Sequence, residues 1–250
     1  KATKAVAAQQ MIKRAERMMR GLEDERQTDK VAAIRFPEPA PCGKTPLSAQ
    51  SLSKSYGSLE IFTDVDLAID RGSRVVVLGL NGAGKTTLLR MLAGNTAPDT
   101  GEVVYGHGAK IGYFAQEHEI LDGERTVLEN MKSAAPDLDD TRVRTILGSF
   151  LFSGDDVEKP AGVLSGGEKT RLSLATLVAS SANILLLDEP TNNLDPASRK
   201  EILNALKAYK GAIVMVSHDE GAVEALNPER VLLLPDAVED LWSKEYQDLI

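Results

Sequence analysis

The stretch GLNGAGKTT, Gly79 to Thr87, decides how this sequence is interpreted. It matches the pattern G-x-x-x-x-G-K-[ST] and overlaps the end of RVVVLGL, a continuous apolar run typical of a strand buried on both faces. The glycines let backbone N–H groups turn inward around phosphate, and the N-terminus of a following helix adds a positive dipole end. The stretch therefore predicts a phosphate-binding (Walker A) loop between a strand and a helix that runs to Ala93.

Short apolar runs and helical patterns alternate along the rest of the chain. The predicted strands lie within residues 46–57, 60–70, 74–80, 183–190, 211–219 and 230–236, and the predicted helices within residues 82–93, 168–180 and 195–210. The last helix has Asp195 at its N-cap and Pro196 at its first position. This alternation indicates an α/β fold with a mainly parallel sheet.

Length and composition are those of an ordinary globular chain. With 250 residues, 42% of them apolar and 26% charged, the chain can form a domain with an appendage. The single cysteine, Cys42, excludes an internal disulfide and favours a reducing compartment, so we expect a cytoplasmic location. No apolar run approaches the ~18 residues that span a bilayer, and no transmembrane segment is expected in this chain.

The charge is unevenly distributed. Residues 1–36 carry nine Lys/Arg and five Asp/Glu, a net +4, whereas the other 214 residues carry 20 and 32, a net −12. Apolar residues recur every three to four positions in the first segment, which predicts a helix, and four prolines between residues 37 and 46 predict an extended connector. We therefore expect a partial helical linker (1–36), a connector (37–46) and a globular domain (47–250). The basic segment is suited to a polyanion, and a solvated helix face is the alternative.

The run ILLLDEP, residues 184–190, ends a predicted buried strand in two carboxylates. Asp188 is expected to lie beside the phosphate loop and to hold a metal ion, and Glu189 to polarise an attacking water as general base. Adjacent acids can also be a plain strand-end turn, but their position after a phosphate loop favours the chemical role. Lys85 is expected to reach the β- and γ-phosphates, and the Thr86 hydroxyl to bind Mg²⁺.

A third motif, LSGGEKTRLSLA at residues 164–175, lies between these two. Together the three motifs resemble those of ATP-binding cassette (ABC) ATPases over residues 47 to about 235. The resemblance implies a P-loop NTPase cassette with a mainly parallel core sheet, an antiparallel β-subdomain and a helical signature subdomain. In that family the signature of one cassette closes over the γ-phosphate held by another. The implied partner is a second cassette, either the missing N-terminal half of a longer protein or another copy of this chain.

The resemblance also implies roles for individual residues. Tyr56 resembles the aromatic residue that stacks on adenine, Gln116 the glutamine that senses magnesium and water, and His218 the histidine that contacts the γ-phosphate. Asp195 ends the loop 192–195, which crosses between cassettes. The implied nucleotide-binding residues are Tyr56, Asn81, Gly82, Ala83, Gly84, Lys85, Thr86, Thr87, Ser165, Gly166, Gly167 and Asp195. The implied catalytic residues are Glu189, His218 and Gln116. The implied Mg²⁺ ligands are Thr86, Gln116 and Asp188.

Two kinds of cassette remain open. The stretches IGYFAQEHE, FLFSGDDVEK and EPTNNLD resemble the second cassette of class F (ABC-F) twin-cassette proteins, which act on ribosomes, and residues 1–36 fit part of the linker between their cassettes. This resemblance implies the C-terminal half of a ribosome-associated ATPase of translation or antibiotic-resistance type, with RNA contacts through the linker and weak turnover in the isolated half. The alternative is the ATP-binding subunit of an ABC membrane transporter.

Two departures from the class F pattern bear on the ribosomal role and not on the ATPase chemistry. Asn193 stands where histidine is common, and EGAVEAL follows SHD where arginine and aromatic residues are usual.

Overall fold

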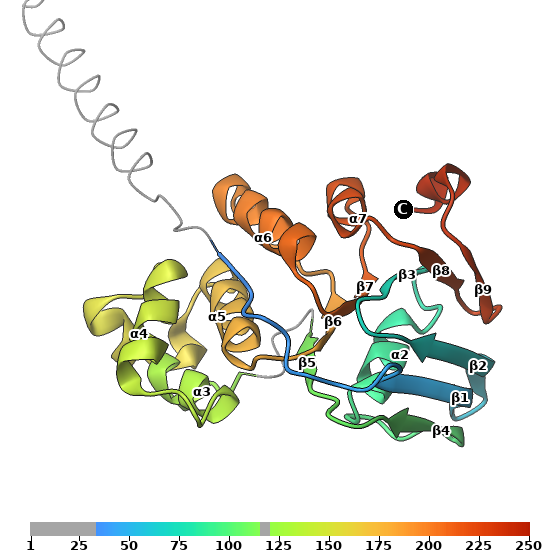
Figure 1. Ribbon diagram of the computed structural model, residues 1–250, viewed down its shortest axis with the longest axis horizontal. Helices are drawn as coiled ribbons and strands as arrows, with labels where there is room; N and C mark the ends of the chain where they lie inside the picture. The colour runs from blue at the N-terminus through green and yellow to red at the C-terminus, as the bar shows by residue number, and fades with distance from the viewer. Residues whose placement is uncertain (1–33, 116–120) are drawn as a thin grey trace, which may run out of the picture.

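The computed structural model describes residues 34–115 and 121–250 (Figure 1). The strands are β1 (Leu47–Tyr56), β2 (Leu59–Ile69), β3 (Arg74–Leu78), β4 (Thr100–Tyr105), β5 (Ile111–Phe114), β6 (Ile184–Asp188), β7 (Ala212–Val216), β8 (Arg230–Leu233) and β9 (Val238–Leu241). The α-helices are α2 (Lys85–Leu92), α3 (Val127–Ala134), α4 (Asp140–Ser149), α5 (Gly166–Ala179), α6 (Pro196–Ala208) and α7 (Glu220–Leu226), and the 3₁₀ turns are η1 (Gly154–Glu158), η2 (Ala161–Val163) and η3 (Lys244–Leu249). Most of the predicted helical linker, and Gln116, lie outside the described residues.

A six-stranded sheet in the order β5-β6-β7-β3-β8-β9 forms the centre of the domain. All neighbouring pairs are parallel except β8 and β9. Strands β6 and β7 are buried along their whole length, as their continuous apolar runs require. The predicted α/β fold with a mainly parallel core sheet is confirmed.

Successive side chains of these strands point to opposite faces, so the sheet separates two apolar cores. On one face Leu185 and Leu187 of β6 pack with residues of α5, α6 and α7. On the other face Ile184 and Leu186 pack with residues of α2 and of the second sheet. Helix α2 is thus enclosed between the two sheets (Figure 1), which fixes its N-terminus beside the end of β3.

The second sheet is wholly antiparallel, in the order β2-β1-β4. It is the antiparallel β-subdomain that the family resemblance implied. Its edge strand β4 escapes the sequence pattern because five of its six residues are exposed, which leaves no alternation of apolar and polar positions.

The segment between β5 and α5 forms the helical subdomain, with α3 and α4 at one end of the molecule (Figure 1). Capping boxes begin both α3 and α5: Thr126 pairs with Glu129, and Ser165 with Glu168. Each box satisfies N–H groups that a helix start leaves without partners. The start of α5, which carries the signature motif, is therefore sharply defined.

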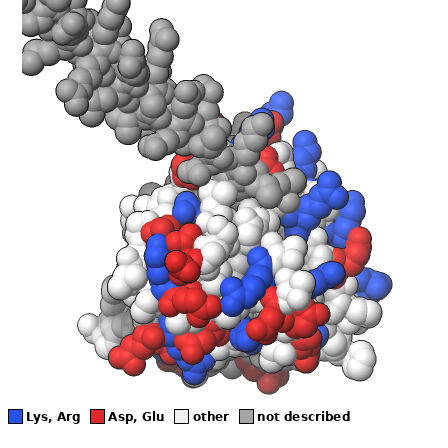
Figure 2. All heavy atoms as spheres, turned by 90° about the vertical axis from the view of Figure 1, so that its left-hand side faces the viewer, with Lys and Arg blue, Asp and Glu red and all other residues white. Residues whose placement is uncertain are grey.

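Acidic and basic side chains are interspersed over the outer face of this end of the molecule (Figure 2). Four surface ion pairs place the two signs side by side within the helical subdomain: Arg125 with Asp122, Lys132 with Asp140, Arg144 with Glu158, and Lys159 with Asp156. The described part of the face in view is therefore not a uniformly basic surface of the kind that binds a polyanion.

The proline-rich connector, residues 37–46, forms neither helix nor strand, and contacts on and around it hold it against the globular domain. Ile34 is 5% exposed in the core, and the Phe36 ring packs on that of Tyr209 with centroids 5.3 Å apart. The side-chain amide of Asn183 donates to the carbonyl oxygen of Ala40 at 3.1 Å. Residues 34–36, predicted as the end of the helical segment, are not helical, because a proline at position 37 disfavours helical geometry in the residue before it.

The C-terminal part returns to the core sheet. Strand β9 pairs with β8, and Trp242, Tyr246 and Ile250 pack against the core beside it. Within residues 34–115 and 121–250, no helix is both long enough and apolar enough to cross a bilayer.

Candidate functional site

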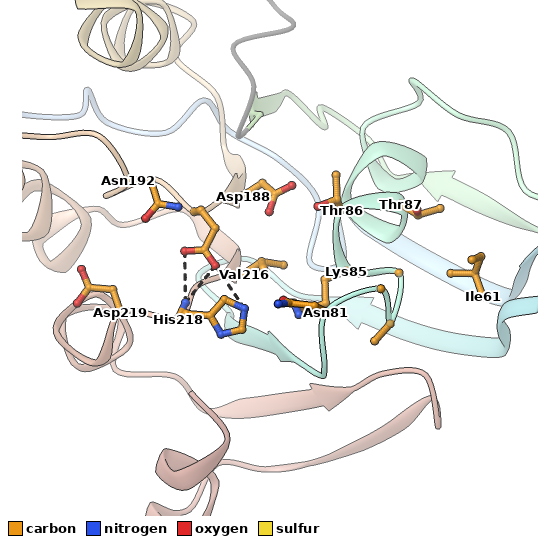
Figure 3. Close-up of a pocket in the computed structure, with 14 residues that line it drawn as sticks. Ile61, Asn81, Lys85, Thr86, Thr87, Asp188, Asn192, Val216, His218 and Asp219 are labelled. Atoms are coloured by element: carbon orange, nitrogen blue, oxygen red, sulfur yellow. Dashed lines mark hydrogen bonds and ion pairs between the residues drawn. The ribbon is translucent and has the colours of Figure 1, made fainter. Parts of the chain in front are cut away.

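A pocket of about 460 Å³ opens where the chain leaves β3, β6 and β7 (Figure 3). Loops that follow neighbouring parallel strands meet at the same edge of a sheet, which is where ligands bind in such folds. The lining residues are Ile61, Asn81, Gly82, Ala83, Gly84, Lys85, Thr86, Thr87, Asp188, Glu189, Asn192, Val216, His218 and Asp219. Residues that the sequence assigned separately to phosphate, metal and catalysis thus share one pocket.

The loop between β3 and α2 has a backbone that favours glycine. Gly84, the N-cap of α2, has φ +92°, and a Cβ atom there would lie 2.3 Å from Cγ2 of Ile61. Gly82 has φ +86°, but no atom lies within 4 Å of its Cβ position, so it borders open space. The N–H groups of the first turn of α2 have no helical partners and stand at the pocket, which makes this end an anion site.

Lys85 supplies the positive charge of this site. The residue is 9% exposed, and its Nζ atom donates to the carbonyl oxygens of Gly79 at 2.6 Å and Leu80 at 3.1 Å. Burial lowers the pKa of the Lys85 ammonium, while the charges of Glu189 and Asp188 raise it and offset part of that shift. Lys85 is therefore held on its own loop, with two carboxylates nearby.

Asp188 ends β6 and is 1% exposed. Its carboxylate points toward the side chain of Thr86, the second residue of α2 (Figure 3). Both groups offer oxygen atoms, the ligands that hard divalent cations prefer. Within the described residues no cluster of three or more His, Cys, Asp or Glu is placed to hold a metal. A cation here would take its other ligands from phosphate and water.

Glu189 follows Asp188 in a left-handed backbone conformation, with φ +51°, and is 7% exposed. Its carboxylate accepts the backbone N–H of His218 at 3.1 Å and the Ser217 hydroxyl at 3.3 Å. Burial, the largest effect, raises the pKa of Glu189 despite these hydrogen bonds. A carboxyl group with a raised pKa is suited to general-base catalysis near neutral pH.

The His218 ring lies beside this carboxylate. Its Nε2 atom is 3.8 Å from Oε1 of Glu189 (Figure 3). Its Nδ1 atom is 3.1 Å from the main-chain oxygen of Ile250. With these contacts the ring stands at the same pocket as Lys85. A cation, a carboxylate and an imidazole thus surround the space next to the phosphate loop.

Sequence reasoning missed four lining residues: Ile61, Asn192, Val216 and Asp219. Asp219 had a signal, because it directly follows His218 at the end of a predicted strand. Ile61 had none, because it belongs to β2 of the other sheet and reaches the pocket only through the tertiary fold.

The other predicted nucleotide-binding residues do not line this pocket. Tyr56 ends β1 and is 52% exposed, with Nζ of Lys54 5.5 Å from its ring centroid. Ser165 is the N-cap of α5, with Gly166 and Gly167 in the first turn. Asp195 is the N-cap of α6, as predicted, and accepts the N–H groups of Ala197 and Ser198 at 3.0 Å each.

The signature motif contacts the loop before α6 within the same chain. A Cβ atom at Gly167 would lie 3.2 Å from the carbonyl oxygen of Asn193, which has φ +61°. This left-handed backbone suits asparagine, the residue found here where the class F pattern has histidine.

Comparison with known proteins agrees with the motifs. The family model described as ABC transporter matches residues 62–192, just over half of the chain. A probable ATP-binding protein YheS of Escherichia coli O6:H1 is 40% identical over 96% of this chain and 37% of its own length. ABC transporter F family member 5 of Arabidopsis thaliana is 34% identical over 85% of this chain and 31% of its own length. The chain thus spans between three tenths and two fifths of the length of these relatives.

A solved structure has the same fold. The dimeric post-hydrolysis state of the ATP-binding cassette MJ0796, bound to ADP and Pi, superposes with a TM-score of 0.66 over 78% of this chain and 98% of that one, at 24% identity. The family match, the relatives and the arrangement of the pocket lead to one conclusion. The chain belongs to the ABC transporter family and has the fold of its ATP-binding cassettes.

Proposed function

We propose that this chain binds Mg·ATP in the pocket described above and hydrolyses it when a second cassette closes over the nucleotide. The observation that carries the proposal is the convergence of Lys85, the first-turn N–H groups of α2 and the side chains of Asp188, Glu189 and His218 on one pocket. Phosphoryl transfer needs little more from a protein than positioning and charge stabilisation, and these groups supply both.

The phosphates lie against the loop of residues 81–87. Lys85 exchanges its hydrogen bonds to Gly79 and Leu80 for bonds to the β- and γ-phosphates, which also relieves the cost of its burial. The Thr86 hydroxyl and the Asp188 carboxylate would hold Mg²⁺, with Gln116 as a third proposed ligand. When bound, Mg²⁺ neutralises charge on the phosphate oxygens.

Hydrolysis follows in-line attack of water on the γ-phosphorus, with cleavage of the bond to the bridging oxygen of ADP. Glu189 orients the water and accepts its proton on a carboxylate oxygen, for which its raised pKa is suited. His218, fixed beside Glu189, stabilises the charge on the γ-phosphate oxygens.

The second cassette is needed because the signature residues stand outside this pocket. Ser165, Gly166 and Gly167 form the N-terminus of α5, a helix of 14 residues whose dipole favours an anion. We propose that they bind the γ-phosphate held by the partner, that Asp195 lies in the loop that crosses to it, and that Tyr56 stacks on adenine.

Trapping the closed state tests this proposal. Glu189→Gln keeps an acceptor oxygen but cannot take a proton, so with Mg·ATP it should accumulate as a dimer, measured by light scattering. Glu189→Gln combined with Lys85→Ala is the matched control and should stay monomeric, because phosphate binding is lost. A mass that stays monomeric for Glu189→Gln at high protein concentration counts against the sandwich. Full-rate hydrolysis by a demonstrated wild-type monomer would refute it too.

We further propose that the chain is the C-terminal cassette of a soluble, cytoplasmic class F protein that acts on ribosomes. The relative from Arabidopsis is named as an F family member. The match to YheS covers 96% of this chain, more than residues 34–250 alone could supply, so it extends into the basic N-terminal segment. That segment carries +4 and would contact RNA.

Co-sedimentation separates this role from the transporter alternative. The full-length protein carrying Glu189→Gln should pellet with ribosomes in the presence of ATP, and addition of Lys85→Ala should abolish the effect. Recovery with a membrane permease, and none with ribosomes, would overturn the class F proposal while leaving the ATPase proposal intact.

A further inference from the structure

Two loops carry the groups that face the proposed γ-phosphate position. Hydrogen bonds connect these two loops at two places, called joints below. The loop after β6 carries Glu189 and Thr191, and the loop after β7 carries His218 and Asp219. At the first joint the Glu189 carboxylate accepts the His218 N–H at 3.1 Å. At the second joint the Thr191 hydroxyl donates to Oδ2 of Asp219 at 2.9 Å.

Arg199 holds the second joint in place. Its Nε atom donates to Oδ2 of Asp219 at 2.8 Å and its Nη2 atom to Oδ1 at 2.6 Å, a two-point contact that fixes the plane of the carboxylate. The N–H of Gly221 donates to Oδ1 at 2.9 Å. Thr191 is 6% exposed and the Asp219 side chain 20%, so this joint is largely removed from solvent.

The arginine comes from a different element, α6. Helix α6 begins at Pro196, directly after the loop 192–195, and Arg199 is its fourth residue. The glycine at position 221 leaves room for the guanidinium, since a Cβ atom there would lie 2.8 Å from Nη2 of Arg199. The EGAVEAL stretch, which departs from the pattern expected after SHD, thus presents a residue without a side chain where the arginine lies.

We infer that Arg199 is a positioning residue for ATP hydrolysis. Through Asp219 it holds Thr191, and it thereby fixes the Glu189 carboxylate relative to the His218 ring, now 3.8 Å away. Because Arg199 stands on α6, that separation is coupled to the loop 192–195 at the start of the same helix. Arg199 does not line the pocket and acts only through Asp219. This inference rests on the proposed ATPase function.

The expected effect is on the chemical step. Without the guanidinium, Asp219 keeps Thr191 and the N–H groups of α7, so the local fold is retained but its link to α6 is lost. Nucleotide affinity depends on Lys85 and the loop amides, which Arg199 does not touch. A displacement of about 1 Å of reacting groups costs up to about 10²-fold in rate, so we expect a loss of about tenfold for a partial displacement.

Single-turnover hydrolysis tests the inference. The 250-residue chain is used in excess over ATP, at a concentration where the wild type forms ATP-bound dimers, and a fluorescent ATP analogue gives Kd. Arg199→Ala should lower the rate about tenfold with Kd within about twofold of wild type, and Arg199→Lys should recover part of the rate. Arg144→Gln, which removes the 3.1 Å ion pair to Glu158 far from the pocket, should match the wild type.

Equal rates for Arg199→Ala and wild type overturn the inference, as does an equal loss in Arg144→Gln. A rate loss matched by an equal loss of affinity assigns Arg199 a structural role and overturns it too. If Arg199→Ala does not fold, Arg199→Lys decides: a slower rate at wild-type Kd supports the inference, and a wild-type rate or weakened binding overturns it. If wild-type dimers do not hydrolyse ATP at all, the proposed function fails, whatever Arg199 does.

Discussion

Gly84 and Gly82 offer a paired test of the phosphate loop. Both have left-handed backbones, with φ +92° and φ +86°. They differ in surroundings: a Cβ atom at Gly84 would lie 2.3 Å from Cγ2 of Ile61 and 2.8 Å from Cδ1 of Phe62, whereas Gly82 has no neighbour within 4 Å. Alanine at both positions therefore costs backbone strain, but only Gly84→Ala also forces the loop against β2.

The two contributions can be given magnitudes. A side chain in a left-handed conformation costs about 1–2 kcal/mol, which applies to both variants. Forcing a methyl group into a filled space costs about 1–3 kcal/mol, which applies to Gly84→Ala alone. For a chain of this size 1 kcal/mol shifts Tm by about 2–4 °C. We expect Gly82→Ala to lower Tm by about 2–8 °C, and Gly84→Ala to lower it by about 2–12 °C more.

Thermal unfolding without nucleotide, followed by circular dichroism, gives the comparison. Gly148→Ala, at a position within α4 without close neighbours, controls for the added methyl group and should unfold no lower than the wild type. Equal Tm values for Gly82→Ala and Gly84→Ala would refute the reasoning, because contact with Ile61 and Phe62 would then carry no weight.

Three further predictions concern other parts of the domain. Burial raises the pKa of Glu189, so the folding stability of the wild type falls as the pH rises from the ordinary carboxyl pKa to the raised pKa. Glu189→Gln removes this titration and should therefore raise Tm at pH 7. The gain in Tm should vanish when thermal unfolding is measured at acidic pH, where Glu189 is protonated. Thr126→Ala removes the capping box of α3 and should cost about 0.5–2 kcal/mol in urea unfolding, with unchanged binding of an ATP analogue. Phe36→Ala loses the ring contact with Tyr209 and should speed limited proteolysis after Arg35. Tyr56→Ala, which removes an exposed ring at the end of β1, should leave this proteolysis unchanged.

The core of the fold was predictable because its strands are buried on both faces. A run such as Ile184–Asp188 has no polar residue before its end, and few structures other than a central parallel strand accept it. Strand β5 was missed because four residues, Ile111–Phe114, are too short to display a period. The connector was misjudged in part, since prolines predict an extended chain but not what that chain packs against.

The site was predictable where chemistry coincides with strand ends. Asp188, Glu189 and His218 each follow a buried run, and parallel strands bring such ends together. Arg199 had no comparable signal: on α6 it reads as an ordinary surface arginine. Its role depends on the distance between α6 and the loop after β7, which only the folded chain defines.

The packing of residues 34–46 on the domain limits how far a module upstream of this domain could move away from it. Ten connector residues, if free, could span at most about 33–36 Å and let a neighbouring module search that radius. Contacts of Ile34, Phe36 and Ala40 with the domain hold the connector in place, so the connector does not extend the reach of a neighbouring module. An insertion within residues 34–46 would therefore have to break these contacts before it could change the effective concentration of an upstream module.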